Sequence, residues 1–372
     1  MKYDYLVVGA GLAGCTVAER LASQLDASVL VVDQRPHIAG NVYDPLEPSG
    51  IRVHRYGPHI FHTNSREVVE YLSGFTSWRP YEHRVLARIG ERLVPIPISR
   101  RTIRELYSLE LDEAAAARFF AERAEAVARI ITSEDAIVSK IGRELYETFF
   151  RGYTRKQWAL DPSELDASVC GRIPIRTDDD DRYFTDAFQA LPLDGYAAMC
   201  ARMLRHPRIE VQTGISFACA ADRVTFDRVI YTGPIDEFFG HRFGHLPYRS
   251  LRFEFETFDR PHVQPVAVIN EPDESVAYTR TTEFKHLTGQ VHPATTVARE
   301  FPSATGEPYY PIPRPDNRAL YARYAKLARR EPHVLFVGRL AQYKYLNMDQ
   351  VVAAALLSFE SIAAEVAIDQ IA

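Results

Sequence analysis

The chain opens with a short apolar run, a glycine-rich turn and an amphipathic stretch. Residues 5–8 are uninterrupted apolar positions, as in a buried parallel strand, and residues 12–24 carry apolar positions at helical spacing. A second apolar strand is predicted over residues 28–32 and ends at Asp33. Strand, turn, helix and strand in this order predict a βαβ unit of the Rossmann type.

The glycines between the first strand and the helix fall as G-x-G-x-x-G, at Gly9, Gly11 and Gly14. This spacing permits a tight turn, lets a pyrophosphate approach the backbone and brings the helix close to the strand. The helix beginning at Leu12 directs its first N–H groups at the phosphates. Asp33 is placed to bind ribose hydroxyls, so we predict a dinucleotide site. A glycine-rich turn in an unrelated α/β domain is the alternative.

The loop after Asp33 predicts a further contact with the same ligand. Gly40 and Asn41 follow a proline and are placed to present backbone N–H groups. Residues 57–64 then predict a turn into a short strand that carries His59 and His62. A metal site needs further ligands nearby, and none follows in sequence, so we expect these histidines to pack against a planar cofactor and expect no metal.

The remaining pattern predicts an α/β fold with insertions. Strands are predicted at residues 85–87 and 93–97, a helical region from 101 to about 160 with a helix over 114–131 and another starting at 133, and strands at 209–212 and 228–233. Residues 248–300 alternate as in a half-exposed antiparallel sheet, and 308–313 are extended. A buried strand over 334–337, then Gly338, Arg339 and a helix through 359, form a second place for the cofactor.

Aromatic and basic residues alternate at residues 149–158. Flat rings beside cations suit a nucleobase with phosphates, although the same rings are equally typical of a packed helical core. Further along, Arg172 and Arg176 lie on a proline-containing loop, which predicts a mobile anion clamp. The acidic run at residues 178–181 is predicted to be a solvated loop.

Composition narrows the function. The 372 residues exceed a single core, which favours two or three substructures. A net charge of −5 argues against a general binder of nucleic acid or anionic membranes. No stretch is expected to approach the ~20 apolar residues of a membrane span. Four scattered cysteines fit idle thiols in a reducing cytoplasm.

Six motifs, in order, resemble the flavin-dependent UDP-galactopyranose mutases of prokaryotes. They are the N-terminal glycines with Asp33, residues 57–63, residues 153–158, Arg172-x-Pro174 before 182–184, Thr279-Arg280 before 283–286, and 338–340 with Tyr343 and Tyr345. The resemblance implies a discontinuous Rossmann-like FAD-binding domain (1–66, 201–240, 320–372), an inserted helical domain (99–170) and a twisted antiparallel sheet domain (67–98, 171–200, 241–319). It also implies a cytoplasmic homodimer acting in cell-wall or polysaccharide biosynthesis.

The resemblance implies interconversion of UDP-galactopyranose and UDP-galactofuranose. In that family the ring contracts through a covalent adduct at N5 of reduced FAD, with no net redox change. FAD is therefore the expected cofactor, active when reduced by NAD(P)H or a chemical reductant. UDP-galactose in both ring forms is the expected partner.

Site residues carry over by position. The expected catalytic residues are Arg172, Arg280 and His62. The expected substrate-binding residues are Phe149, Phe150, Tyr153, Thr154, Trp158, Arg172, Tyr183, Arg249, Asn270, Arg280, Tyr310, Tyr345 and Asn347. The expected cofactor-binding residues are Gly9, Gly11, Leu12, Gly14, Asp33, Gln34, Gly40, Asn41, His59, Ile60, Gly338, Arg339, Tyr345, Asn347 and Met348. Asn347 departs from the Asp of many members, and Ala39 from their usual Gly.

Three other functions compete with this one. A flavin oxidoreductase of the amine-oxidase type shares the N-terminal motif, but an amine substrate needs no paired arginines. A non-catalytic FAD- or nucleotide-binding module leaves a full set of clamp residues unexplained. A mutase on a related nucleotide sugar, such as UDP-N-acetylgalactopyranose or a dTDP-sugar, differs from the expected enzyme by only a few contacts, and the exact sugar stays open.

Overall fold

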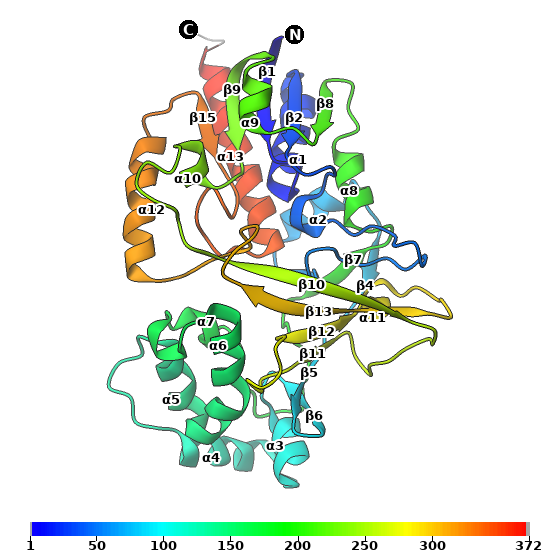
Figure 1. Cartoon of the computed structure of the whole chain (residues 1–372), viewed down its shortest axis with the longest axis vertical. Helices are drawn as coiled ribbons and strands as arrows, with labels where there is room; N and C mark the ends of the chain where they lie inside the picture. Colours follow the sequence, from blue (N-terminus) through cyan, green and yellow to red (C-terminus); the bar gives the residue numbers. More distant parts are fainter. Residues whose placement is uncertain (1, 370–372) are drawn as a thin grey trace.

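The N-terminal βαβ unit forms as the sequence predicts. In the computed structural model, which describes residues 2–369, β1 (Lys2–Val8), α1 (Leu12–Leu25) and β2 (Val29–Asp33) follow one another (Figure 1). With β8 (Ile209–Thr213), β9 (Thr225–Tyr231) and β15 (Val334–Phe336) they build a parallel five-stranded sheet in the order β15-β9-β1-β2-β8. This sheet is Rossmann-like and joins strands from both ends of the chain.

Helices cover both faces of this sheet. On one face α1 packs against α13 (Met348–Asp369) and α8 (Tyr196–Met203). On the other, α9 (Phe217–Ala221) covers a small cluster that includes Leu6, Leu30 and Val32. The two neighbouring residues Leu6 and Val7 are both fully buried, as expected for a strand covered on both faces.

The longest strands form a second, seven-stranded sheet in the order β14-β10-β13-β12-β11-β5-β6. Its members are β5 (Val85–Ile89), β6 (Arg92–Ile96), β10 (Tyr248–Phe258), β11 (Val268–Asn270), β12 (Arg280–Glu283), β13 (Thr295–Ser303) and β14 (Tyr310–Pro311). All neighbours are antiparallel except β11 and β5, which run parallel. The predicted sheet is thus present but mixed.

The sequence predicts strands throughout residues 248–300, and this prediction is wrong at one place. Residues Phe284–Thr288 form the helix α11. Phe284 and Leu287 are both fully buried, and their spacing of three residues fits one face of a helix rather than one face of a strand.

A third, three-stranded sheet has the order β3-β7-β4. It contains β3 (Phe61–Thr63), β4 (Trp78–Pro80) and β7 (Phe188–Pro192), and the helix α2 (Arg66–Ser73) follows β3. All its pairs are antiparallel. The predicted short strand after Gly57 therefore has its partner more than a hundred residues later.

Residues 100–171 are mainly helical and lie apart from the parallel sheet (Figure 1). The elements are α3 (Arg100–Tyr107), α4 (Glu113–Arg123), α5 (Ser133–Tyr146), the π-helix η2 (Glu147–Arg151), α6 (Gly152–Trp158), the 3₁₀-helix η3 (Pro162–Glu164) and α7 (Ser168–Gly171). The predicted helix over 114–131 is wrong beyond Arg123. There the α4 terminus meets Gly142 of α5, where an added Cβ would lie 2.1 Å from the Arg123 carbonyl oxygen.

The remaining elements are the 3₁₀-helix η1 (Gly40–Val42), α10 (Ile235–Phe238) and α12 (Pro315–Ala328). Cys15, Cys170 and Cys200 are buried and all four thiols are free, as predicted. The predicted domain boundaries include Met1 and residues 370–372, which lie outside the described residues, and those boundaries stay predictions.

The expectation that no stretch of the chain is long and apolar enough for a membrane span is wrong for one helix. Residues Met348–Ile368 of α13 are long and apolar enough to span a membrane, with a mean hydropathy of 1.9. Within this helix Val352, Ala355 and Leu356 pack into the core, and α13 lies along α1. By length and composition alone it is a weak candidate, because a core helix passes the same test.

Candidate active site

The glycine-rich turn has the geometry that close approach of a ligand requires. Gly9 has φ +104°, and a Cβ there would lie 2.0 Å from Thr232 Oγ1. A Cβ at Gly14 would lie 1.8 Å from the Gly9 carbonyl oxygen, so the helix touches the turn directly. At Gly11 the nearest atom to an added Cβ is 3.8 Å away. The turn is therefore tightly packed at Gly9 and Gly14 and open at Gly11, which fits a cradle for a phosphate.

The loop after β2 packs onto this turn. Gly40 has φ +50°, and a Cβ there would lie 2.8 Å from Gly11 Cα. Ala39 tolerates its positive φ of 71° while fully buried. Asp33 accepts hydrogen bonds from Ala10 N at 2.8 Å and from Arg35 N at 2.9 Å. Its carboxylate thus holds the turn in shape and keeps lone pairs free for ribose hydroxyls.

The C-terminal part of the predicted cofactor site meets the same turn. Gly338 has φ +100°, and a Cβ there would lie 3.2 Å from Ala13 Cβ in α1. Val337 N donates to the Tyr231 carbonyl at the end of β9. The turn, the loop at Gly40 and the segment at Gly338 therefore surround one place, although the sequence separates them widely.

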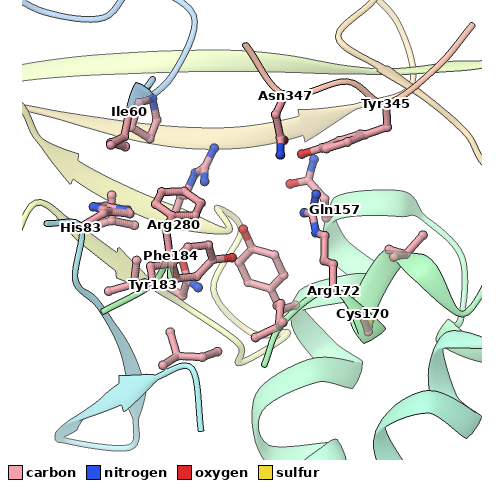
Figure 2. Close-up of a pocket in the computed structure, with 18 of the residues that line it drawn as sticks. Ile60, His83, Gln157, Cys170, Arg172, Tyr183, Phe184, Arg280, Tyr345 and Asn347 are labelled. Carbon is pink, nitrogen blue, oxygen red and sulfur yellow. The ribbon is translucent and has the colours of Figure 1, made fainter. Parts of the chain in front are cut away.

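A cavity of about 490 Å³ adjoins the elements that carry the predicted substrate residues. Side chains from α6, α7, β12, β14 and the start of α13 contribute to its wall. Figure 2 labels Gln157, Cys170 and Arg280 from the first three of these elements. The lining includes the predicted residues His59, Ile60, His62, Phe149, Phe150, Tyr153, Thr154, Trp158, Arg172, Tyr183, Asn270, Arg280, Tyr310, Arg339, Tyr345, Asn347 and Met348. Most of the predicted substrate set thus shares one cavity.

Arg172 follows α7 and extends toward the Tyr345 ring, beside Asn347 (Figure 2). Its guanidinium carbon lies 4.7 Å from the ring centre. Within residues 2–369 no carboxylate forms an ion pair with Arg172. A cation that faces a cavity with no carboxylate beside it is well placed to bind an anionic ligand.

Arg280 is held differently. Its Nε donates to Glu300 Oε2 at 2.8 Å, and the two residues face each other in the register of β12 and β13. Burial by itself would lower the pKa of Arg280, but the charge and hydrogen bond of Glu300, together with Tyr153 and Tyr310, outweigh it and raise the pKa well above its usual value. Glu300 is buried and also lines the cavity. This pair fixes the direction of the guanidinium.

Tyrosines complete the anion-binding wall. Tyr310 and Tyr345 stack with ring centres 5.6 Å apart, and Arg339 lies 4.9 Å from the Tyr345 ring centre. Desolvation by itself would raise the pKa of Tyr345, but Arg172 and Arg339 together lower it. Burial raises the pKa of Tyr153 to about 12 and also raises those of Tyr183 and Tyr310. The hydroxyls of Tyr153, Tyr183 and Tyr310 stay protonated at neutral pH and are available as donors.

Histidines lie on the opposite side of the cavity, where Figure 2 shows His83 with Ile60. His62 stacks on Phe184 with ring centres 3.7 Å apart, and its Nδ1 is 2.9 Å from Asp186 Oδ2. Burial, with a smaller effect from Arg280, lowers the pKa of His83 to about 3, and burial lowers that of His59 to about 4. His59 and His83 are therefore neutral at pH 7, and the permanent side-chain cations at this cavity are arginines.

The aromatic segment at residues 149–158 lines the cavity with its rings. The π-helix η2 adds a wide turn between α5 and α6, a feature that is frequent at functional sites. Phe149 and Phe150 lie on it and are buried. Trp158 is buried at the end of α6, with its ring centre 6.1 Å from that of Tyr310.

The cations of that segment are not at the cavity, so the prediction that they accompany a phosphate is wrong. Lys156 Nζ donates to four carbonyl oxygens of residues 271–278, at 2.5–3.0 Å. Arg155 pairs with Asp161 and Glu274. The lysine instead docks α6 onto a neighbouring loop, where Gly152 also makes close contact.

Two further predictions on basic residues are wrong. Arg176 is buried, and its Nη1 donates to the carbonyls of Asp180 and Arg182 at 2.8 and 2.5 Å, so it shapes its loop and is no part of a clamp. Arg249 is buried behind the cavity wall, where its Nε donates to the Gln157 carbonyl at 2.9 Å.

The acidic run is more ordered than a solvated loop. Asp179 pairs with Arg100, Asp180 with Arg182, and Asp181 with Arg84 at 2.8 Å. These ion pairs hold the run against α3 and β5. Two of these partners, Arg100 and Arg84, are 79 and 97 residues away in sequence, and Arg182 is two residues away, so long-range and local ion pairs together order this stretch.

Sequence reasoning missed several lining residues. They are Tyr56, Pro58, His83, Val85, Ile96, Gln157, Val169, Cys170, Ile173, Pro174, Phe184, Thr185, Asp186, Val268 and Glu300. Glu300 is paired through strand register, which a single sequence does not reveal. Phe184 and Asp186 closely follow Tyr183, a predicted substrate residue, so their position in the sequence could have indicated that they also line the cavity.

Together, the Rossmann sheet with its glycine-rich turn and the cavity of arginines, tyrosines and aromatic rings define a nucleotide-binding enzyme. A sequence profile described as UDP-galactopyranose mutase matches residues 148–345, and one described as an NAD(P)-binding Rossmann-like domain matches residues 7–75. The chain belongs to the UDP-galactopyranose mutase family, whose members are isomerases.

Named relatives cover nearly the whole chain. A probable UDP-galactopyranose mutase of Klebsiella pneumoniae is 37% identical over 370 residues, covering 98% of this chain and 96% of that protein. A dTDP-fucopyranose mutase of Escherichia coli is 35% identical, covering 94% and 96%. A UDP-galactopyranose mutase of Mycoplasma pneumoniae is 33% identical, covering 97% and 96%.

Solved structures share the fold. A crystal structure of reduced UDP-galactopyranose mutase matches with a TM-score of 0.77 at 15% identity, covering 98% of this chain and 94% of that one. A putrescine oxidase bound to putrescine matches with a TM-score of 0.57 at 12% identity, covering 98% and 99%. The Rossmann-like architecture with inserted helices and a large sheet is thus confirmed.

Proposed function

We propose that this enzyme interconverts UDP-galactopyranose and UDP-galactofuranose, with FAD bound in its reduced form. The observation that carries the proposal is Arg172, a cation without an ion-pair partner in residues 2–369 that faces the cavity shared with Arg280 and several tyrosines. A diphosphate supplies the counter-charge that this arrangement needs. Because the chain belongs to the UDP-galactopyranose mutase family, we infer that this diphosphate is part of a nucleotide sugar.

The residues around the glycine-rich turn fit FAD. The open backbone at Gly11, with Gly40 against it, would hold the pyrophosphate, and Asp33 the ribose. His59, Ile60 and Met348 line the cavity and would contact the flavin end. When bound in its reduced form, the flavin supplies the nucleophile for the anomeric carbon.

The protein's own residues bind and orient the substrate. Arg172 and Arg280 neutralise the diphosphate, whose negative charge grows as UDP leaves the sugar. The protonated hydroxyls of Tyr183 and Tyr310 donate to the same oxygens. Glu300 keeps Arg280 in position through its 2.8 Å hydrogen bond. These groups hold UDP while the sugar ring opens and recloses, so that the same UDP returns to it.

The aromatic part of the cavity would hold the uracil in this proposal. Phe149, Phe150 and Tyr153 contribute its wall, and Trp158 closes it next to Tyr310. Stacking on such rings tolerates different bases. This tolerance is one reason to test a thymidine nucleotide alongside a uridine nucleotide.

A mutase acting on a dTDP-sugar is the second candidate. The relative named dTDP-fucopyranose mutase is 35% identical, close to the 37% of the relative named as a probable UDP-galactopyranose mutase. Asn347 lines the cavity beside Tyr345, and its uncharged amide presents a donor as well as an acceptor to a sugar or flavin.

The test uses the dithionite-reduced enzyme with UDP-galactofuranose and, separately, dTDP-fucofuranose, with products separated by chromatography. We expect UDP-galactopyranose as the product, a higher kcat/KM for the UDP-sugar, and no turnover by the oxidised enzyme. A preference for the dTDP-sugar would establish the second candidate. Conversion of neither, or net consumption of one reductant per turnover, would overturn both.

We also propose that the tightly bound cofactor is FAD and that the enzyme is a cytoplasmic homodimer. Heat-released cofactor identified as FAD by chromatography supports the first part, and release of FMN or NAD contradicts it. Light scattering during gel filtration measures the mass in solution, for which 42.3 kDa is the value of one chain. Fractionation of the native host tests the location.

A further inference from the structure

A buried carboxylate lies outside the cavity lining, on the short helix α10. Asp236 Oδ2 accepts a hydrogen bond from Leu246 N at 2.9 Å and lies 3.2 Å from His241 Nδ1. The second oxygen, Oδ1, is buried and has no hydrogen-bond partner among the described residues. Asp236 itself is 2% exposed. One half of a buried carboxylate is therefore left unsatisfied.

The charge of Asp236 is also poorly balanced. Its ion-pair partner within residues 2–369 is His241, in the turn that follows α10, and this histidine is charged only when protonated. Removing a carboxylate from water is costly unless the carboxylate is paired or coordinates a metal. A cation held next to Asp236 would provide that balance.

Two histidines lie where such a cation would bind. The rings of His241 and His245 are 3.9 Å apart, and one ligand atom from each, with one from Asp236, all lie within 4.8 Å of one another. Ligand bonds of about 2.0–2.1 Å in a tetrahedral site place neighbouring donor atoms about 3.3 Å apart. The 3.2 Å between His241 Nδ1 and Asp236 Oδ2 matches that spacing. His245 is exposed and free to adjust.

We propose that Asp236, His241 and His245 bind one divalent cation of the zinc class, with a fourth position open to water. Two imidazoles and one carboxylate are a donor set that suits Zn²⁺. The site is separate from the mutase reaction, because none of the three residues lines the cavity. It ties α10 to the segment that leads into β10. This proposal revises the expectation from sequence that the protein has no metal site.

A second cluster, His262, Glu283 and His286, serves as an internal control. The Glu283 carboxylate accepts from the N–H groups of Val263 and Gln264 and from Thr295 Oγ1, so both oxygens are satisfied. His286 Nε2 lies 2.9 Å from the Gln264 carbonyl oxygen, which only accepts. With that contact made and both Glu283 oxygens satisfied, this cluster has no unpartnered buried oxygen, in contrast to Asp236 Oδ1. We expect this cluster to bind no cation.

The experiment titrates the chelator-treated full chain with Co²⁺, followed by its visible absorption bands, and then displaces Co²⁺ with Zn²⁺. We expect one tight site per chain. Since losing even an outer partner of a metal ligand typically costs 10- to 100-fold in affinity, losing a ligand in His241→Ala or His245→Ala should cost at least about 100-fold. His286→Ala should bind as the wild type does, and mutase activity should be unchanged in His245→Ala.

Three results would overturn the proposal. They are no Co²⁺ site in the wild type, unchanged affinity in both His241→Ala and His245→Ala, or loss of the site in His286→Ala. The exposed His245 keeps the test clear of folding defects, which the buried Asp236 does not. A rise in melting temperature with Zn²⁺ in the wild type, absent in His245→Ala, would support the proposal independently.

Discussion

Arg172→Ala is the sharpest test of how the cavity handles a diphosphate. Two charge-assisted hydrogen bonds from one guanidinium, at about 1.5 kcal/mol each, amount to about 3 kcal/mol. If they strengthen as UDP leaves, turnover falls about 150-fold. The fold should survive, because no carboxylate within residues 2–369 pairs with Arg172 and none is left unpaired by truncation.

Two comparisons isolate this effect. Arg172→Lys should recover little activity, because an ammonium does not reproduce the bidentate fork. Arg155→Ala is the matched control: Arg155 is a partly exposed arginine on α6 that pairs with Asp161 and Glu274 outside the cavity lining. It should keep turnover within about twofold, since exposed ion pairs contribute little. Arg280 is unsuitable as a control because its loss leaves the buried Glu300 unpaired.

The assay is single-turnover conversion of UDP-galactofuranose by pre-reduced enzyme, with the melting temperature and the bound cofactor measured on the same samples. We expect Arg172→Ala to lose rate while keeping both other values. Normal turnover in this variant would refute the assigned role. Loss of cofactor together with rate would instead assign Arg172 to the cofactor site.

Three further predictions follow from the cavity and the turn. Trp158→Ala should weaken UDP binding about 5- to 150-fold, since a stacked base contributes about 1–3 kcal/mol; calorimetry that shows intact UDP affinity but lost cofactor would assign Trp158 to the core. Gly14→Ala should fail to fold, because its Cβ would lie 1.8 Å from a backbone oxygen. Gly11→Ala should keep its circular dichroism spectrum and lose cofactor affinity. A normal melting temperature for Gly14→Ala would contradict the first of these expectations. Because burial and Arg280 lower the pKa of His83 to about 3, the unfolded chain binds more protons below pH about 6.5, so stability should fall as pH decreases toward 3. Thermal melts from pH 7 to pH 4 should therefore show a shallower decline for His83→Phe, and equal slopes would exclude this effect.

Local spacing explains what the sequence predicted well. The glycine-rich turn depends on residues within one short stretch, and Gly9 and Gly14 show the close contacts that their spacing implies. The same holds for the strand–helix–strand order around them. Most residues expected at the substrate site also share the cavity, because the resemblance to a family carries long-range information that periodicity lacks.

Long-range pairing explains what the sequence did not predict. Arg280 and Glu300 meet through the register of two strands, and Lys156 finds carbonyl oxygens more than a hundred residues later. Basic side chains close together in sequence therefore separate in space, as Arg172 and Arg176 do. Nothing in the local pattern distinguishes an arginine that binds substrate from one that holds a loop.

The order of strands in the parallel sheet has a consequence for biosynthesis. β1 is made first, yet its neighbour β9 and the edge strand β15 come from the middle and the end of the chain. At about 5–20 residues per second, the ribosome needs at least about 15 s between the first strand and the last. β1 pairs early with β2, but its other neighbour β9 comes much later and the neighbour of β9, β15, comes last. One edge of the growing sheet therefore stays unpaired during synthesis, so the nascent chain has a lasting need for protection from aggregation.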